Sequence, residues 1–548
     1  MQTGRYRRPW VLLVFAVFTL VWFSTLEYRK LIKPDEGRYA EIAREMAASG
    51  DWITPRLDGI KYFEKPPLQY WATAATYKVF GLDEWTSRLW PALTGFAGVL
   101  VAVFAGRRLF GATAGLLAGV VLGTSLWYLI IGHLNTLDMG VTFFLEVALC
   151  TFLFAQVSPR DSPAERRWML VAWGAMALAV LSKGLEGLVL PGLTLLVYCA
   201  VQRDFTAFKR RHFAAGLALF FLIAAPWFIA VSIVNPEFPG FFFVHEHFER
   251  FLTKAHGRYQ PDWYFIPIFA VGMLPWTTMA LHGALSGWRA PAHPAFNARR
   301  FLALWAGVIF VFFSLSSSKL PSYILPIFPA VALLAGDWLY QRPARALRWH
   351  IAVLVLVATV ALALLPRLAH FAEGGTPDDM ILRYARWLLV AAAIFGAGTL
   401  LALWLNARGR SLTALVALGV AALFAGETTL QGHEALGISN SAYYIAKQIK
   451  PRLEPGLPFY SVGMYEQTLP FYIERTVTLV DYKDEFAFGL KQEPRLAVPT
   501  MAEFEARWAS EPGALAVFSR EGFKQMEKQG LPMQVLAEDT RRVIVRRP

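Results

Sequence analysis

The sequence predicts an all-α polytopic membrane bundle of about thirteen transmembrane helices, followed by a C-terminal α/β domain outside the membrane. Three observations predict this fold class. The 548 residues are 56% hydrophobic and only 17% charged, with a mean hydropathy of +0.40, whereas soluble domains carry about 25% charged residues. Apolar runs of about 20 residues recur, which is the length that spans a hydrocarbon core of about 30 Å. These runs stop near residue 430.

The first apolar run, Trp10 to Leu26, follows three arginines as the core of a signal peptide would. It is long, lacks an A-x-A cleavage site and is followed directly by charged residues, so we interpret it as an uncleaved first helix. Twelve further runs follow it. The thirteen predicted spans lie near 10–26, 89–105, 111–131, 139–157, 168–182, 187–201, 213–234, 263–283, 301–318, 321–340, 349–366, 384–405 and 412–430.

Arginine and lysine placement sets the orientation. With the N-terminus in the cytoplasm, seven short inner segments carry twenty basic residues, as the positive-inside rule requires. The first outer segment, residues 27–88, is also basic, and long loops cross largely regardless of charge. The net charge of +13 adds attraction for anionic lipid head groups. We expect a monomer that in a bacterium lies in the inner membrane, with membrane lipids and no nucleic acid among its partners.

Residues 431–548 predict a soluble α/β domain, and the transmembrane region therefore comprises residues 1–430. Its expected strands are Leu457–Val462, Thr476–Val480, Ala514–Phe518 and Val543–Val545, and its expected helices are Ser441–Lys450 and Thr500–Ser510. After thirteen spans this domain lies outside, which in a bacterium is the periplasm. It carries no motif that points to chemistry. Both cysteines lie in apolar runs, so no disulfide framework is expected.

The first outer segment opens on a predicted helix. Pro34 fits a helix start, and Asp35 and Glu36 lie in the first turn, where the helix dipole favours carboxylates. Apolar residues occupy one face and charged residues, including Arg38, the other. Such a helix is expected to lie flat at the membrane interface. Asp35 is either a capping carboxylate or part of a site, and its spacing alone leaves both open.

A second cluster in this segment contains Arg56, Tyr62 and Lys65, ahead of the paired prolines Pro66 and Pro67. Paired prolines stiffen the chain and hold the preceding lysine in place. A lysine, an arginine and tyrosines at the membrane edge suit a phosphate carried on a lipid. The aromatic residues that follow fit the interfacial aromatic belt.

Three later outer turns carry further candidates. Asp138 at the mouth of a span is either functional, because intramembrane carboxylates are costly, or an N-cap. His245 precedes Arg250 in a His-Glu-His segment, where two histidines are a weak metal pattern and an interfacial structural role is favoured. Lys319 and Tyr323 flank a turn rich in hydroxyl groups.

Taken together, these motifs resemble a known family. They are Asp35-Glu36-Gly37-Arg38-Tyr39, Glu64-Lys65-Pro66-Pro67, Leu137-Asp138 and Lys319-Leu320-Pro321-Ser322-Tyr323. The set resembles the GT-C membrane glycosyltransferases that use polyprenyl-phosphate sugars. Within them the chain is similar to the bacterial 4-amino-4-deoxy-L-arabinose transferases of lipid A, and more widely to protein O-mannosyltransferases. The resemblance covers residues 1–430 and is less specific for aminoarabinose than for the superfamily.

The resemblance implies undecaprenyl phosphate-linked aminoarabinose as donor and a lipid A phosphate as acceptor, a modification that gives resistance to cationic antimicrobial peptides. It implies Asp35 and Asp138 as the catalytic carboxylates and Lys65 as the ligand of the carrier phosphate. The further implied substrate contacts are Arg250, Tyr62, Arg38, Arg56, Lys319 and Tyr323. The resemblance also implies Glu64 and His245 as ligands of a zinc-like divalent ion, in a family whose metal dependence varies.

The implied reaction is a single inverting displacement at the anomeric carbon. A loop aspartate often acts as a general base. However, a phosphomonoester has a second pKa of about 6 and is largely deprotonated at neutral pH. The acceptor phosphate therefore needs little help from a general base. Cations are needed instead to neutralise the departing phosphate. We therefore assign the phosphate to Lys65 and Arg250, and favour Asp35 and Asp138 for binding the sugar ammonium group and orienting the acceptor.

Two other classes remain open. A protein O-mannosyltransferase or a related polyprenyl-sugar transferase would use a hydroxyl acceptor, and Asp35 would then be a true base. A transporter of lipid-linked sugars would show internal repeats and midplane charges, whereas the charges here gather at the outer face and no repeat is evident. The sequence does not fix the sugar or the lipid A phosphate that is modified.

Overall fold

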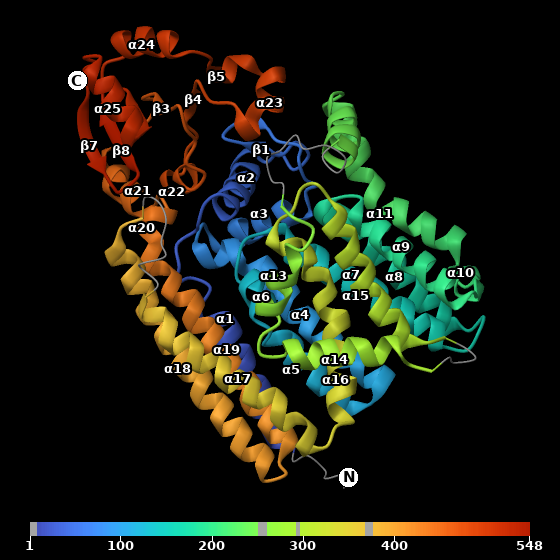
Figure 1. Cartoon of the computed structure of the whole chain (residues 1–548). Helices are drawn as coiled ribbons and strands as arrows, with labels where there is room; N and C mark the ends of the chain where they lie inside the picture. Colours follow the sequence, from blue (N-terminus) through green and yellow to red (C-terminus); the bar gives the residue numbers. More distant parts are fainter. Residues whose placement is uncertain (1–7, 250–259, 292–295, 368–375) are drawn as a thin grey trace. The chain divides into compact units, whose positions relative to one another are not determined.

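The computed structural model describes residues 8–249, 260–291, 296–367 and 376–548 (Figure 1). The chain forms two compact units that are discontinuous in sequence. The first unit comprises Met1–Leu26, Trp90–Pro366 and Trp387–Gln431, and the second comprises Glu27–Leu89, Arg367–Arg386 and Gly432–Pro548. The division into 1–430 and 431–548 follows chain order, whereas the structure groups the first outer segment with the tail.

The first unit is a bundle of apolar helices. Its elements are α1 (Arg8–Ser24), α4 (Glu84–Phe110, which begins in the second unit), α5 (Ala112–Gly123), α6 (Leu126–Gly132), α7 (Leu137–Val157), α8 (Pro163–Lys183), α9 (Glu186–Gln202), α10 (Thr206–Lys209), α11 (Phe213–Val234), η1 (Gly240–Glu249), α13 (Phe265–Gly272), α14 (Thr277–Trp288), α15 (Ala298–Leu315), η2 (Pro321–Ile327), α16 (Phe328–Tyr340), α17 (Ala344–Leu364), α18 (Asp378–Ala407, which also begins in the second unit) and α19 (Ser411–Gly432, whose last residue belongs to the second unit). Each predicted apolar run lies on one of these helices or on a bent pair of them.

The structure confirms a mostly helical membrane bundle. Among the described residues, eight helices are long and apolar enough to cross a membrane, or up to ten if each bent pair is one span. The number thirteen therefore stays a prediction. The two bent pairs are α5 with α6, bent by 65°, and α13 with α14, bent by 111°.

The two bent pairs contact each other at their breaks. The backbone N–H of Leu126 donates to the carbonyl oxygen of Leu274 at 3.1 Å, and the indole Nε1 of Trp276 donates to Oγ1 of Thr124 at 3.0 Å. Pro275 lacks an N–H and interrupts the second helix. Non-helical backbone inside an apolar bundle needs such internal partners, so each break satisfies polar groups of the other.

The second unit is built around a mixed sheet. Within residues 432–548 its elements are η4 (His433–Leu436), α20 (Gly437–Asn440), α21 (Tyr443–Ile449), η5 (Lys450–Arg452), β3 (Phe459–Val462), α22 (Leu469–Ile473), β4 (Thr478–Val480), η6 (Asp484–Phe486), α23 (Ala487–Gln492), η7 (Pro494–Leu496), β5 (Ala497–Val498), α24 (Met501–Ser510), β6 (Leu515–Ser519), α25 (Arg520–Lys528), β7 (Gln534–Glu538) and β8 (Arg542–Arg546). The strand order is β5-β4-β3-β6-β8-β7.

The predicted α/β tail is confirmed. Strands β5, β4, β3 and β6 are parallel, and β8 pairs antiparallel with β6 and β7. All four predicted strands and both predicted helices appear, with ends shifted by a few residues at most. The core between the sheet and helix α24 contains Phe504, Trp508 and Phe518, which are all fully buried. Figure 1 shows α24 and α25 beside this sheet.

The first outer segment forms α2 (Asp35–Ser49), β1 (Arg56–Leu57), β2 (Ile60–Lys61) and α3 (Leu68–Phe80). Helix α2 begins after Pro34 as predicted and ends at Gly50, whose φ is +74°. The strands β1 and β2 form a hairpin through Asp58 and Gly59, with φ values of 54° and 78°. Positive φ at both turn residues is typical of a tight two-residue hairpin.

The charged face of α2 is buried, and the orientation of α2 flat at the membrane interface stays a prediction. Glu36, Arg38, Glu41 and Arg44 are all buried within the second unit. Buried charges persist only when they are paired, and here Arg44 pairs with Glu41 through Nε at 2.7 Å. The charged face of α2 is therefore an internal packing surface rather than a surface facing water.

Candidate functional site

The candidate residues fall into two groups, one in each unit. In the second unit, the Asp35 side chain is 39% exposed and accepts a hydrogen bond from Nη1 of Arg38 at 3.0 Å. Arg38 is buried and also forms an ion pair with Glu485 of the tail. Nε2 of Gln467 donates to the other oxygen of Glu485 at 3.0 Å. The ion pair with Glu485 of the tail thus positions Arg38, and the hydrogen bond from Arg38 positions Asp35.

Glu485 is an unusual partner because it is itself buried. Burial raises the pKa of Glu485 above its ordinary value, and the Arg38 charge offsets only part of that rise. An arginine between two carboxylates can bridge both with its planar fork of donors. The resulting chain of contacts fixes the Arg38 guanidinium in one orientation beside Asp35.

Three tyrosines line this group. Tyr62 and Tyr70 are buried, and their hydroxyl groups have no hydrogen-bond partner within the described residues. Tyr39 lies beside Tyr70 with its ring centroid 6.0 Å away. Burial, with the charge of Glu64, raises the pKa of Tyr62 and Tyr70, so both remain neutral hydroxyl donors. Unpartnered buried hydroxyls call for water or a ligand.

The structure therefore brings Asp35, Arg38, Tyr62 and Glu64 together. Asp35 and Tyr62 both interact electrostatically with the Arg38 guanidinium, and Arg38 and Glu64 both interact with the Tyr62 hydroxyl. Glu64 is half-buried, as is the adjacent Lys65. The paired prolines that follow lead directly into α3.

A glycine makes the contact with the tail possible. A Cβ at Gly37 would lie 2.6 Å from Thr468 and 2.7 Å from the backbone of Gln467. Any side chain at this position would push the loop that carries Gln467 away from α2. The glycine of the Asp-Glu-Gly-Arg motif is thus required by a close approach of backbone to backbone.

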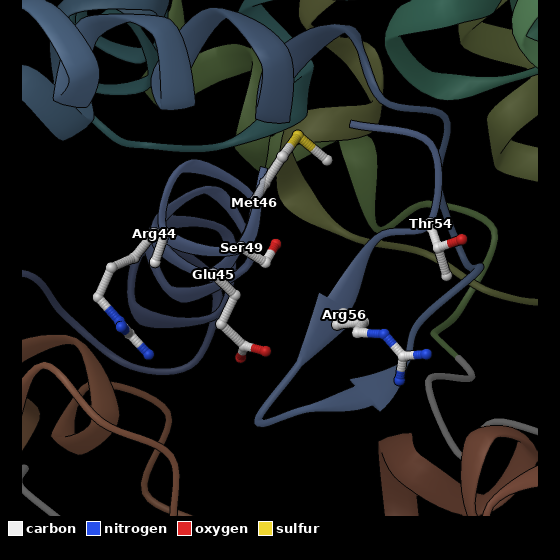
Figure 2. Close-up of a pocket in the computed structure, with 7 residues that line it drawn as sticks. Arg44, Glu45, Met46, Ser49, Thr54 and Arg56 are labelled. Atoms are coloured by element: carbon white, nitrogen blue, oxygen red, sulfur yellow. The ribbon is translucent and has the colours of Figure 1, made fainter. Parts of the chain in front are cut away.

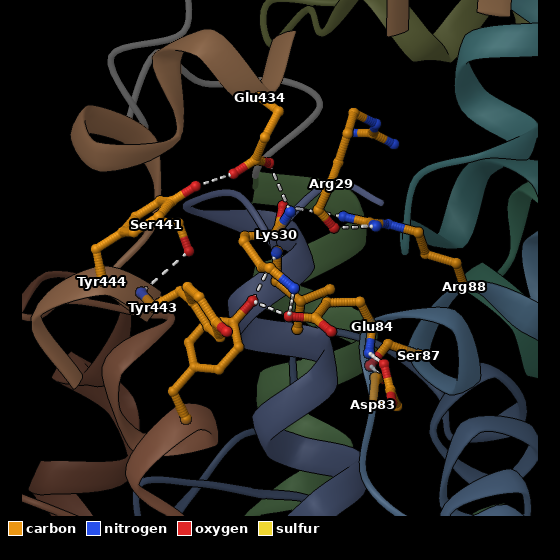
Figure 3. Close-up of polar contacts among 12 residues, drawn as sticks. Arg29, Lys30, Asp83, Glu84, Ser87, Arg88, Glu434, Ser441, Tyr443 and Tyr444 are labelled. Carbon is orange, nitrogen blue, oxygen red and sulfur yellow. Dashed lines mark hydrogen bonds and ion pairs between the residues drawn. The ribbon is translucent and has the colours of Figure 1, made fainter. Parts of the chain in front are cut away.

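Glu36, next to Asp35, makes a fully buried ion pair with Arg88. Nε and Nη2 of Arg88 donate to the two carboxylate oxygens of Glu36 at 2.7 and 2.8 Å. Arg88 also donates to the carbonyl oxygens of Arg29 at 2.6 Å and Lys30 at 3.1 Å; Figure 3 shows the Arg29 contact. This bidentate ion pair is buried and fixes the position of the first turn of α2.

Lys30 extends this network to the tail (Figure 3). Its Nζ pairs with Glu84 at 3.1 Å, and its backbone N–H donates to Glu434 at 2.8 Å. The other oxygen of Glu434 accepts from the Tyr444 hydroxyl. The residues leading into α2 are therefore held by both the first outer segment and the tail.

Beside α2 lies a pocket of about 190 Å³, drawn in Figure 2, whose lining includes Arg44, Glu45 and Arg56. Its arginines have partners: Arg44 pairs with Glu41, and Arg56 pairs with both oxygens of Glu493 at 3.0–3.1 Å. Arg56 is thus engaged by the tail, and its predicted phosphate contact stays a prediction. The oxygen of Glu45 that does not bond Gly59 has no partner within the described residues.

In the first unit, Asp138 lies in the first turn of α7. Nζ of Lys183, the last residue of α8, donates to its carboxylate at 2.6 Å. The same ammonium group is 3.6 Å from Glu186 and 4.5 Å from the centre of the Tyr323 ring. The structure thus joins two predicted residues, Asp138 and Tyr323, through a lysine.

The turn before Asp138 is anchored by His133. Its Nδ1 contacts the carbonyl oxygen of Leu129 at 2.8 Å, and its Nε2 contacts that of Trp22 at 2.7 Å. Glu427 lies 3.2 Å from the same Nε2. Helices α1, α6 and α19 therefore fix the approach to Asp138.

The remaining predicted residues of the first unit have separate surroundings. Lys319 is buried and its Nζ donates to the carbonyl oxygen of Gln260 at 2.9 Å. His245 is half-buried in η1 and its ring stacks on Phe241 with centroids 5.2 Å apart. Arg250 lies outside the described residues, so its assignment remains a prediction.

The residues offer a limited fit to a metal ion. Among the described residues, no group of three or more His, Cys, Asp and Glu side chains is arranged to hold one. Glu64 and His245 belong to different units. One carboxylate and one imidazole are fewer than the three protein ligands of a typical catalytic zinc site. The proposed reaction therefore contains no step on a metal ion.

Comparison with known proteins supplies the family. The family model of the aminoarabinose transferase C-terminal domain matches residues 445–547, and that of dolichyl-phosphate-mannose-protein mannosyltransferase matches residues 10–242. An undecaprenyl phosphate-alpha-4-amino-4-deoxy-L-arabinose arabinosyl transferase of Sodalis glossinidius is 33% identical over 402 residues, covering 70% of this chain and 71% of that protein. The chain belongs to this family.

Two further relatives support the same membership. The corresponding transferase of Proteus mirabilis is 36% identical over 62% of this chain, an alignment that spans 60% of the relative's own length. The crystal structure of ArnT from Cupriavidus metallidurans bound to undecaprenyl phosphate matches with a TM-score of 0.95 and 40% identity, over 99% of both chains. The arabinosyl transferases are glycosyltransferases, and the predicted resemblance to them is confirmed.

Three features of the candidate site were not identified from the sequence. Lys183 is a lone lysine between two apolar runs, and such a residue is as strong a functional candidate as Asp138. Glu485 gave no sequence signal, because only the folded tail places it at Arg38. The partner of Glu36 was equally hidden, since Arg88 lies at the start of a span and 52 residues away.

Proposed function

We propose that this protein transfers 4-amino-4-deoxy-L-arabinose from undecaprenyl phosphate to a phosphate of lipid A at the periplasmic face of the inner membrane. The observation that carries the proposal is the likeness over 99% of the chain to ArnT from Cupriavidus metallidurans, whose crystal structure holds undecaprenyl phosphate. The match to an aminoarabinose transferase C-terminal domain supports the same sugar.

The reaction is a single displacement. An oxygen of the acceptor phosphate forms the new bond to the anomeric carbon, while the bond to the carrier oxygen breaks and undecaprenyl phosphate leaves with the electron pair. No proton needs to be removed, because a phosphomonoester is already largely ionised at neutral pH. The protein must instead bring two anionic phosphates to one sugar, which calls for fixed cations.

The geometry sharpens the roles of the two aspartates. Asp138 already holds Lys183 at 2.6 Å, so we assign it to positioning that ammonium group. A lysine on a flexible stem can exchange partners, and Lys183 is suited to contact the acceptor phosphate. Asp35, which is 39% exposed, is the better carboxylate for the sugar's ammonium group. Lys65 and Arg250 are assigned to the carrier phosphate.

Transfer in proteoliposomes tests this function. Purified protein, the lipid-linked donor and lipid A are combined, and lipid A is analysed by mass spectrometry for an added aminopentose. We expect addition by the wild type and at least a 100-fold slower rate for Asp35→Asn. Glu27→Gln, an exposed carboxylate in the same segment, is the matched control and should act as wild type. Wild-type rates in Asp35→Asn would refute the assignment.

The carrier-phosphate role of Lys65 has its own test. Lys65→Glu places a negative charge beside an anionic ligand and should weaken binding of undecaprenyl phosphate at least tenfold. Lys78→Glu makes the same change at an exposed position of α3 and should leave binding unchanged. Equal affinity in the two variants, measured by competition with the donor, would show that Lys65 does not hold the carrier.

A second candidate is transfer to a protein hydroxyl, favoured by the match of residues 10–242 to a protein mannosyltransferase model. In that case Asp35 would remove the proton of the acceptor hydroxyl. Mass spectrometry of lipid A and of secreted proteins from a deletion strain separates the two. Loss of the aminopentose from lipid A alone supports the first function, and loss of protein glycans supports the second.

We further propose thirteen crossings, a cytoplasmic N-terminus, a periplasmic tail and a monomeric state. Reporter fusions at the turns between predicted spans would test the topology, and light scattering in detergent would test the mass. For the zinc-like ion of Glu64 and His245, elemental analysis of purified wild type and His245→Ala is decisive. Identical metal content in the two proteins would exclude His245 as a ligand.

A further inference from the structure

Helix α14 packs closely on α16, as Figure 1 shows. A Cβ at Gly283 would lie 2.8 Å from the backbone of Leu334, and one at Gly287 would lie 2.7 Å from its side chain. The two glycines, four residues apart on one face of α14, let the helices approach as small residues do in membranes. This packing places α14 beside the last turns of α16.

Those last turns carry an indole surrounded by nitrogen-bearing side chains. The ring of Trp338 lies 5.4 Å from that of His282 on α14 and 5.3 Å from that of His350 on α17. The guanidinium of Arg342 lies 5.0 Å over the same indole. The two imidazoles are 5.0 Å apart, centre to centre. Three helices thus gather two histidines and an arginine around Trp338.

Thr278 orients both imidazoles. Nδ1 of His282 contacts the carbonyl oxygen of Thr278 at 2.8 Å, and Nδ1 of His350 contacts its Oγ1 at 2.9 Å. Within the described parts of the chain, neither Nε2 atom has a protein partner. Nδ1 of His350 can accept from the Thr278 hydroxyl, which leaves an Nε2–H of His350 as a donor for an anion.

Arg342 and its neighbour Arg299 differ in their charge partners. No carboxylate lies within ion-pair distance of Arg342 among the described residues, whereas nearby Arg299 is paired with Asp337 at 2.7 Å. His282 is exposed, and His350 and Arg342 are half-buried. A group of this composition on the outside of a membrane bundle needs an anionic partner or water.

The surroundings place this group at the level of lipid head groups. It lies at the arginine-rich end of α16, which the positive-inside rule assigns to the cytoplasm. Exposed Trp288, Tyr340 and Trp349 form an aromatic belt there. Beyond the histidines, Leu285 and Leu356 are exposed on α14 and α17 and offer an apolar surface for acyl chains.

We propose that His282, His350 and Arg342 bind the phosphate of an anionic phospholipid in the leaflet on the arginine-rich side of the bundle. The guanidinium contributes paired donors and charge, and His350 contributes an Nε2–H donor with the His282 imidazole beside it. Basic pockets between transmembrane helices on the cytoplasmic side bind anionic lipid head groups in this way. The site is independent of the transfer reaction and would take a structural lipid rather than a substrate.

Native mass spectrometry of the full-length protein tests the site. Delipidated protein is titrated with phosphatidylglycerol or phosphatidylcholine in detergent, and bound lipid is counted. We expect one phosphatidylglycerol to bind at least tenfold more tightly than phosphatidylcholine. Arg342→Gln should lose about tenfold in that affinity, the effect of one charge-assisted contact, and the double variant His282→Gln/His350→Gln should lose at least as much.

Arg348→Gln is the matched control. Arg348 lies on α17 and stacks on the exposed ring of Trp349 at 5.9 Å, so it has the same charge and the same leaflet without the histidines. Its affinity for phosphatidylglycerol should equal that of the wild type. Equal losses in Arg342→Gln and Arg348→Gln would reduce the site to general surface charge. Displacement of the lipid by millimolar inorganic phosphate would reassign it to free anions, and both results overturn the proposal.

Discussion

The two candidate aspartates are neutralised by different cations, and the difference separates the roles of the two units. Asp138 contacts Lys183 from a neighbouring helix of the bundle. Asp35 contacts Arg38, which is also bound by Glu485 of the tail. A lysine presents a mobile point charge, whereas arginine presents a rigid fork of donors. The bundle therefore carries a cation that can change partner, and the second unit carries one that cannot.

The largest effect is expected from breaking the buried ion pair between Arg88 and Glu36 in the second unit. Arg88→Met removes the cation that pairs with the buried carboxylate of Glu36, which costs about 3–5 kcal/mol. We expect hydrogen exchange in α2 to accelerate by two orders of magnitude or more, while α7 and α16 of the bundle keep their protection. Arg495→Met, at an exposed position of the tail, serves as control. Uniform acceleration in both units would show that the pair does not stabilise the second unit selectively.

The role of the Lys183 ammonium group in the bundle is tested by the variant Lys183→Met. Removing the ammonium group leaves Asp138 and Glu186 without their counter-ion and the acceptor phosphate without a cation. We expect kcat/KM for lipid A to fall about 100-fold with little change in donor affinity. Lys209→Met, an exposed lysine of the same unit, should behave as wild type. Activity of Lys183→Met within threefold of wild type would remove Lys183 from the reaction.

A smaller effect is expected where the tail reaches the site. Glu485→Gln removes one of the two carboxylates that hold Arg38, so kcat should fall about tenfold while Asp35 keeps its contact. Glu493→Gln breaks the comparable tail contact to Arg56 and should leave kcat unchanged. If both variants lose activity equally, the tail acts through general packing and not through Arg38.

The smallest effect is a pH dependence confined to the second unit. Burial raises the pKa of Glu45 and of Asp58, so the folded state binds these protons more tightly than the unfolded state. Stability contributed by these groups is complete below their ordinary pKa near 4 and declines as the pH rises toward the raised values. Glu45→Gln/Asp58→Asn should flatten the decline in exchange protection of the β1–β2 hairpin, and an unchanged slope would contradict this.

Much of the fold followed from the sequence, because its signals are local. Each apolar run became a helix or a bent pair, and the alternating segments of the tail became strands. The burial of the charged face of α2 was not predicted, because amphipathic periodicity reports two faces but not what covers them. Its charged face is buried by partners such as Glu485 and Arg88, and no local pattern predicts them.

The candidate site was only partly predictable for the same reason. Motifs identified Asp35, Arg38 and Asp138, whose spacing to helix starts is local. Lys183 and Glu485 act through contacts made across the fold, and the sequence gives no distance between positions 38 and 485. Hydroxyl groups of Tyr62 and Tyr70 became informative only when the structure showed them buried and unpartnered.

The discontinuous second unit has a consequence for biosynthesis. Its first part, Glu27–Leu89, ends 396 residues before Glu485. At translation rates of about 5–20 residues per second, that interval is roughly 20–80 s. During this time the tail has not been synthesised, so Arg38 lacks its partner Glu485 and Gly37 lacks the loop that carries Gln467. A truncated product would therefore insert a complete set of apolar helices yet never assemble the surroundings of Asp35, so that competence for sugar transfer arrives only with the last part of the chain.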